Sequence, residues 1–318
     1  MRVEDFRCST STRARGDALG GSATAVAAVL MMEDPGPYGY TAWLDARLPA
    51  GLGAEVIARG KVAGVRPQLI RRGDRPVDAR RRVFVAYAGA DGPAWLESAV
   101  VSDPREVLDL DLAALARGQS VGLTSWTDPV LLVCTHGKHD RCCAERGRPV
   151  YAAAADAAPD LAWQTSHLGG DRYSGNLLAL VGGSHLGGLM FGELDPETTP
   201  GVVRDLAAGR LPLASMRGRT CWPKPVQAAE VLLRTQLGLT GLGGVDLAAY
   251  ELDGQATDAT VDFTVAAAAD PEAGLVRGPA HWRVRVVAHA SEPVRLSCHK
   301  DDLEPAVSWR LGQLDRVA

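Results

Sequence analysis

The chain has 318 residues, of which 46% are hydrophobic and 23% are charged, and its net charge is −4. This composition is typical of a globular protein of two or more domains and excludes a disordered chain. The acidic balance gives no support for a general nucleic-acid-binding surface.

No apolar run reaches the roughly 20 residues that a membrane-spanning helix needs, and the first 21 residues lack the apolar core of a secretory signal. We therefore expect a cytoplasmic protein with no membrane partner. Six cysteines in a cytoplasmic chain indicate metal binding, redox chemistry or simple burial rather than a disulfide framework.

The N-terminal third of the chain predicts a unit with the order β-α-β-β-β-α. Polar residues 1–20 come first and are expected to form a loosely held segment that contains Cys8. Hydrophobic periodicity and breaker residues then predict a buried strand over 23–32, helical structure over 40–62, strands over 67–71, 82–88 and 94–100, and a helix over 104–117.

The next segment repeats this order. It predicts a strand over 130–133, a helix opened by Pro149 over 149–158, strands over 162–166, 177–181 and 186–193, and a helix over 197–208. An Asp-Pro pair precedes the last helix of each unit. The repeated order is consistent with a duplication.

The remaining residues predict an appended α+β region, with a helix over 226–237 and β-structure over 259–266, 281–289 and 294–299. The fold class is thus α/β (α+β), with two units in tandem and a C-terminal region of unassigned role. The expected domains are residues 1–125, 126–212 and 213–318.

Soft metal ligands are densest between residues 128 and 176. An apolar strand ends in Cys134, the pair Cys142–Cys143 precedes a helical segment, and a second strand is followed by His167 and Asp171. Thiolate and imidazole bind zinc, copper and iron–sulfur clusters. The spacing of these cysteines fits neither a zinc knuckle nor a Cys-x-x-Cys dithiol.

The motifs CTHGKHDRCC, GRPVY and SHLGGDRYSGN resemble those of the sucrase/ferredoxin-like family. The segments SATAVAAVLMMEDPGPYG, PQLIRRGDRP and CWPKPVQAAE also resemble the family's bacterial members, so the likeness spans most of the chain. The resemblance implies a thioredoxin-like fold that binds a 2Fe–2S cluster through the pattern Cys-x8-Cys followed by His-x3-His.

Carried over to this sequence, the resemblance places Cys134 and Cys143 on the cysteine pair and His167 on the first histidine. The chain departs from the pattern at Asp171, which stands where the second histidine is expected. The fourth ligand is therefore Asp171, Cys142 or a water molecule. Zinc is the alternative metal.

The resemblance implies a one-electron carrier with an unknown redox partner protein, rather than a catalyst. Sucrase activity has no support, because no carboxylate pair stands in a recognisable glycosidase context. The alternative function is a thiol-based redox enzyme or sensor that uses Cys142 or Cys143, whose pKa the nearby arginines could lower. We expect His136 and His139 to be exposed loop residues, and we assign no role to the three remaining cysteines, which are Cys8, Cys221 and Cys298.

Overall fold

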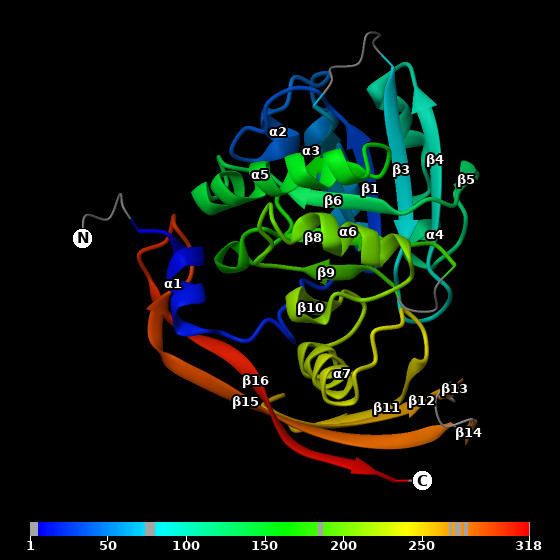
Figure 1. Ribbon diagram of the computed structural model, residues 1–318. Helices are drawn as coiled ribbons and strands as arrows, with labels where there is room; N and C mark the ends of the chain where they lie inside the picture. Colours follow the sequence, from blue (N-terminus) through cyan, green and yellow to red (C-terminus); the bar gives the residue numbers. More distant parts are fainter. Residues whose placement is uncertain are drawn as a thin grey trace.

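The computed structural model has mixed α/β architecture, as expected, and contains a large and a small sheet (Figure 1). It describes residues 6–73, 80–183, 187–266, 269–270, 275–276 and 279–317. In the part of the chain so described, every helix is too short or too polar to span a lipid bilayer.

The strands of the large sheet come from both expected units, except β10 (Met216–Arg219), which belongs to the region expected as the C-terminal domain. The others are β1 (Ala28–Glu33), β2 (Val65–Arg71), β3 (Arg81–Tyr87), β4 (Trp95–Val101), β5 (Thr124–Trp126), β6 (Val130–Cys134), β7 (Ala162–Thr165), β8 (Leu177–Leu180) and β9 (Leu189–Phe191). Within the described residues they lie in the order β10-β9-β8-β6-β7-β2-β1-β3-β4-β5. Of the strand expected over 186–193, Leu186 lies outside those residues.

The two units have the same strand order and directions. In the first, β2 pairs parallel with β1, and β3 and β4 follow as antiparallel neighbours. In the second, β7 pairs parallel with β6, and β8 and β9 follow in the same way. Strands β2 and β7 pair antiparallel and join the units into one sheet.

Helices cover the sheet and connect its strands. They are α1 (Cys8–Arg15), α2 (Ala42–Asp45), α3 (Leu52–Ala63), α4 (Leu112–Ala116), α5 (Arg141–Ala157), α6 (Thr199–Ala207) and α7 (Lys224–Leu237), with 3-10 turns η2 (Pro104–Asp109), η3 (Asp171–Tyr173) and η4 (Leu213–Ser215). Alternate residues of β1 face opposite ways. Leu30 packs in the cluster with α3, and Met31 packs in a cluster that continues across β6.

The C-terminal region forms a separate antiparallel sheet, which lies below the large sheet in Figure 1 with α7 between the two. Its described strands are β11 (Val245–Leu252), β12 (Asp258–Val265), β15 (Ala280–Arg295) and β16 (Leu303–Arg316), in that order; β13 (Ala269–Asp270) and β14 (Leu275–Val276) pair with each other. The helix packs on this sheet through residues such as Val226 and Leu233, which share a core with Val261 and Phe263.

Three sequence-based predictions are wrong in ways that bear on function. The N-terminal segment is not loosely held, because Cys8 begins α1 and is fully buried. Helix α5 begins at Arg141 rather than at Pro149, because the Asp140 side chain accepts a hydrogen bond from the Cys142 N–H and caps the helix there. Of the strand expected over 294–299, Val294 and Arg295 belong to β15, and residues 296–299 form a loop because β15 ends at Arg295.

Candidate metal centre

Four side chains predicted to bind a metal meet at one edge of the large sheet. Cys134 ends β6, Cys143 lies in the first turn of α5, His167 follows β7 and Asp171 begins η3. The donor atoms of Cys134, Cys143 and His167 lie within 4.8 Å of one another. Asp171 Oδ1 lies 3.4 Å from Cys143 Sγ and 3.2 Å from His167 Nδ1.

Strand pairing explains this convergence. Strands β6 and β7 are parallel neighbours with Cys134 opposite Thr165, so the loops that follow both strands leave the same edge. Helix α5 lies close to the end of β6 because Gly147 has no side chain. A Cβ added there would stand 1.9 Å from the Cys134 carbonyl oxygen.

The loop that carries His167 and Asp171 is held by buried and half-buried polar side chains. Arg66 Nη2 and Gln68 Nε2 donate hydrogen bonds to the His167 carbonyl, at 2.7 and 3.2 Å. On the other side of the loop, the fully buried Arg217 donates to the Gly169 carbonyl at 3.1 Å. The ligand-bearing loop is thus fixed from both sides.

The glycine pair in this loop is required by its conformation and its neighbours. Gly169 and Gly170 have φ angles of +95° and +78°, and a Cβ on Gly170 would stand 2.2 Å from Arg217 Nη2. Asn176 completes the support, because its side chain donates to the Gly170 carbonyl at 2.9 Å and accepts from Arg217 at 2.7 Å. No sequence pattern predicts these roles of Arg217 and Asn176, because polar residues are usually exposed and local sequence does not mark their burial.

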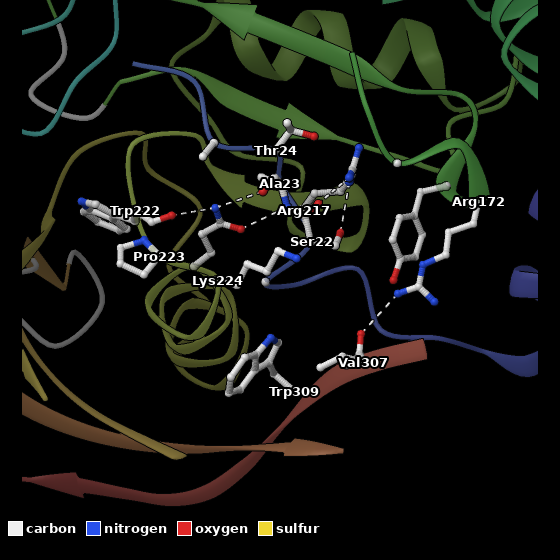
Figure 2. Close-up of a pocket in the computed structure, with 15 residues that line it drawn as sticks. Ser22, Ala23, Thr24, Arg172, Arg217, Trp222, Pro223, Lys224, Val307 and Trp309 are labelled. Atoms are coloured by element: carbon white, nitrogen blue, oxygen red, sulfur yellow. Dashed lines mark hydrogen bonds between the residues drawn. The ribbon is translucent and has the colours of Figure 1, made fainter. Parts of the chain in front are cut away.

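A cavity of about 490 Å³ lies behind this loop (Figure 2). Gly170, Arg172 and Tyr173 form one wall, and residues 21–25, Lys224 and Trp309 line the others. Arg217 reaches from this cavity to Ser22 and to the loop. The metal site and the cavity therefore share one turn of the chain.

The prediction that His136 and His139 are exposed loop residues is wrong. His136 is buried, accepts a hydrogen bond at Nδ1 from the His167 N–H at 3.2 Å, and contacts the Gly39 carbonyl through Nε2 at 2.7 Å. These partners require the neutral tautomer with the proton on Nε2. The half-buried His139 stacks on the His167 ring, with the ring centroids 3.7 Å apart.

Hydrogen bonds and burial shift the protonation of the metal-site residues. A hydrogen bond from Cys143 lowers the pKa of Cys134 well below its ordinary value, and the same bond raises the pKa of Cys143. Burial raises the pKa of Asp171 to about 6. Burial alone would lower the pKa of His167, but the Cys134 thiolate and Asp171 outweigh it and raise that pKa. Cys134 and His167 thus each favour the charged form of the other.

Cys142 does not join this site. Its Sγ lies 3.4 Å from the Sγ of Cys298 and belongs to a second group with Cys8 and Asp140. Hydrogen bonds from the Cys298 and Cys8 thiols lower the pKa of Cys142 to about 2. Cys142 and Cys143, although adjacent in sequence, therefore belong to two different groups of potential ligands.

The outer side of the metal site is partly open. The side chains of His167 and Asp171 are 20% and 15% exposed, whereas Cys134 and Cys143 are buried. A cavity of about 370 Å³ lies over this side, lined by Tyr40, His139 and Asp171 and by residues between 296 and 304. A small group or a protein surface can approach the site from this direction.

Comparison with known proteins identifies a family for the central part of the chain. Residues 66–218 match the family model described as sucrase/ferredoxin-like. Neither a curated protein nor a solved structure matches the chain significantly. The matched range contains all four residues at the metal site and leaves Cys8 and Cys298 outside it. Residues 66–218 are thus similar to the sucrase/ferredoxin-like family, the same family that the sequence motifs resemble.

Proposed function

We propose that the protein is a one-electron carrier that binds a 2Fe–2S cluster through Cys134, Cys143, His167 and Asp171. The observation that carries the proposal is the convergence of two buried thiols, an imidazole and a carboxylate at one sheet edge in a chain similar to this family. A 2Fe–2S cluster accepts and returns one electron.

The four side chains suit a 2Fe–2S cluster in two ways. They are of the types that bind iron, and they form two pairs, one for each iron. Cys134 and Cys143 form a buried, hydrogen-bonded thiol pair, which supplies soft ligands away from water. His167 and Asp171 form a second, partly exposed pair at 3.2 Å. Asp171 of this pair lines the cavity from which a redox partner protein would approach. We therefore expect electrons to leave the cluster through the iron that His167 and Asp171 bind.

The ligand types predict where the redox potential lies. A histidine in place of a cysteine removes negative charge and raises the potential above that of an all-cysteine cluster. The Asp171 carboxylate restores part of that charge, so the potential should lie below that of a site with two cysteines and two histidines. The buried Arg217 behind the loop opposes this effect by adding a positive charge near the site.

We also propose that the two units of the large sheet are thioredoxin-like and arose by duplication. This proposal is supported by the strand order of the two units, which is β2-β1-β3-β4 in the first and β7-β6-β8-β9 in the second, with matching strand directions. The second unit carries the cluster. In the first, the loop after β1 begins with Asp34-Pro35-Gly36 and has no thiol at the corresponding place.

The test is an iron and sulfide count on protein purified without oxygen. We expect about two irons and two sulfides per chain, a red-brown colour and a paramagnetic signal after one-electron reduction. Cys134→Ser should lose the iron. Cys221→Ser is the matched control, since Cys221 belongs to neither ligand group, and it should keep the iron.

Three results would overturn the proposal. Colourless protein that holds zinc at Cys134, Cys143 and His167 would assign a structural metal site instead. Iron that stays bound in Cys134→Ser would place the cluster elsewhere. A protein with neither metal, in which Cys143 reacts rapidly with peroxide or a disulfide, would instead favour the thiol-based redox function.

A further inference from the structure

The second group of cysteines comes from three distant parts of the chain. Cys8 is the first residue of α1, Cys142 lies in the first turn of α5, and Cys298 lies in the loop between β15 and β16. Figure 1 shows the start of α1 beside the bend that joins β15 and β16. The Sγ of Cys298 lies 3.4 Å from that of Cys142 and 3.6 Å from that of Cys8.

Asp140 organises this group. Its carboxylate accepts the N–H of Cys142 at 2.8 Å, the N–H of Cys298 at 2.9 Å and the Ser297 hydroxyl at 3.3 Å. Both carboxylate oxygens lie 3.9 Å from the Sγ of Cys8. A carboxylate has four lone-pair positions, and three are used here. The fourth position, on Oδ1, is within reach of the Cys8 thiol at 3.9 Å.

Other contacts keep α1 against α5 and so keep Cys8 beside Cys142. Arg7 forms an ion pair with Glu145 at 2.6 Å, and Arg146 donates to Ser9 at 2.8 Å. Cys8 and Cys142 are both buried, and Cys298 is half-buried. Cys8 and Cys142 lie in the first turns of α1 and α5, where the helix dipole favours thiolate over thiol.

We propose that Cys8, Cys142 and Cys298, with the carboxylate of Asp140, bind one zinc ion separate from the first metal centre. Zinc prefers four ligands of this kind, and its structural sites are closed and buried. With a Zn–S distance of about 2.3 Å, the sulfurs of a tetrahedral site stand about 3.8 Å apart. The observed separations of 3.4 and 3.6 Å need an adjustment of only a few tenths of an ångström.

A disulfide explains this arrangement less well than a metal does. A disulfide would use two of the three sulfurs and leave the third as a buried thiol. Here Cys298 is nearly equidistant from its two neighbours, and a carboxylate completes the group. Because neither sulfur pair is clearly the closer one, the three sulfurs and the carboxylate oxygen are better explained as ligands of one metal ion.

The zinc ion would connect the beginning, middle and end of the chain. It would fix the loop over residues 296–302, and this loop also lines the cavity over His139 and Asp171. The vicinal pair Cys142–Cys143 would then join two metal sites on one helix turn. Zinc would thus fix the position of the loop that borders the cavity over the first metal centre.

Metal analysis of the wild-type protein is the first measurement. We expect about one zinc per chain, in addition to any iron, after passage over a chelating resin. When cobalt replaces zinc, its absorption should show a tetrahedral site with three thiolate ligands. Zinc-free protein after purification with added zinc, or a cobalt spectrum with fewer than three thiolates, would overturn the proposal.

Variants assign the ion to these residues. Cys298→Ser should lower zinc from about one per chain to near zero and leave the iron content unchanged. Cys221→Ser should change neither metal, and Cys134→Ser should lose iron but keep zinc. If Cys298→Ser keeps its zinc, or if wild-type protein is lighter by two hydrogens because two of these cysteines form a disulfide, the zinc site does not exist. Because zinc and iron are counted separately, failure here is distinct from failure of the proposed function.

Discussion

Asp171 is the single residue on which the properties of the metal centre most depend. It stands where the resemblance to the family predicts a histidine, and its carboxylate contacts both Cys143 and His167. Burial raises its pKa to about 6, which shows that its negative charge is poorly solvated. A metal ion would remove this cost by binding the carboxylate directly.

Replacement of Asp171 by histidine should keep the cluster and raise its reduction potential. The reason is that a neutral ligand replaces an anionic one while the number of ligands is unchanged. A redox titration followed by absorbance measures the effect. Asp156→His, on the exposed face of α5, should leave the potential unchanged. An unchanged potential in Asp171→His would show that Asp171 is not a ligand.

His136 should make the stability of the metal-free protein depend on pH. Burial lowers the pKa of His136 below its ordinary value, so the folded protein keeps this ring neutral while the unfolded chain takes up a proton. Stability should therefore fall as pH drops below about 6.5, the ordinary pKa of histidine. Urea unfolding between pH 7 and 5 should show a flatter profile for His136→Asn than for the wild type.

The control for this measurement is His281→Asn, which changes an exposed histidine on β15. Its profile should follow that of the wild type. If His136→Asn loses stability by the same amount at every pH, the role of His136 is confined to its hydrogen bonds with Gly39 and His167.

At the scale of elements, the approach of α5 to β6 sets the distance between Cys143 and Cys134. Gly147 allows this approach, because any Cβ there would collide with the Cys134 carbonyl. Helix α5 also continues through Pro149, which has no N–H to donate to the preceding turn. The cap at Asp140 and the contact at Gly147 therefore determine where the first turns of α5 place Cys143 relative to Cys134.

Gly147→Ala should push α5 away from β6 and weaken metal binding. Overpacking of this kind costs about 1–3 kcal/mol of the free energy of unfolding. Gly201→Ala in α6 is the matched control, since a Cβ there meets nothing within 4 Å and alanine is the better helix former. Urea unfolding and metal content measure both variants. Equal stability of the two would show that α5 can move without loss of the site.

Sequence patterns predict the elements that local periodicity specifies and miss contacts between distant segments. Strands such as β2 and β6, and the donors Cys134, Cys143 and His167, follow from local apolar runs and from the family motif. The burial of His136 depends on Gly39, which lies 97 residues away. The group of Cys8, Cys142 and Cys298 joins positions separated by more than 130 residues, and no local pattern marks it.

At the scale of the whole molecule, α7 joins the large sheet to the C-terminal sheet. One face of α7 packs on β12 and β15, and a fully buried ion-pair network connects the helix to β10. In this network Glu230 Oε1 lies 2.8 Å from both Arg219 and Arg234, and all three side chains are fully buried. The two sheets are thus held together by apolar packing and by one carboxylate between two guanidinium groups.

Glu230→Gln should destabilise the whole protein strongly. The amide keeps the shape of the side chain, but it removes the negative charge that Arg219 and Arg234 both contact, and loss of one charged partner from a buried network costs about 3–5 kcal/mol. Asp205→Asn removes an exposed ion pair with Arg210 and should cost no more than about 1 kcal/mol. Urea unfolding measures both variants. If Glu230→Gln costs as little as Asp205→Asn, the guanidinium groups are neutralised or hydrated by other means, and apolar packing alone joins α7 to the two sheets.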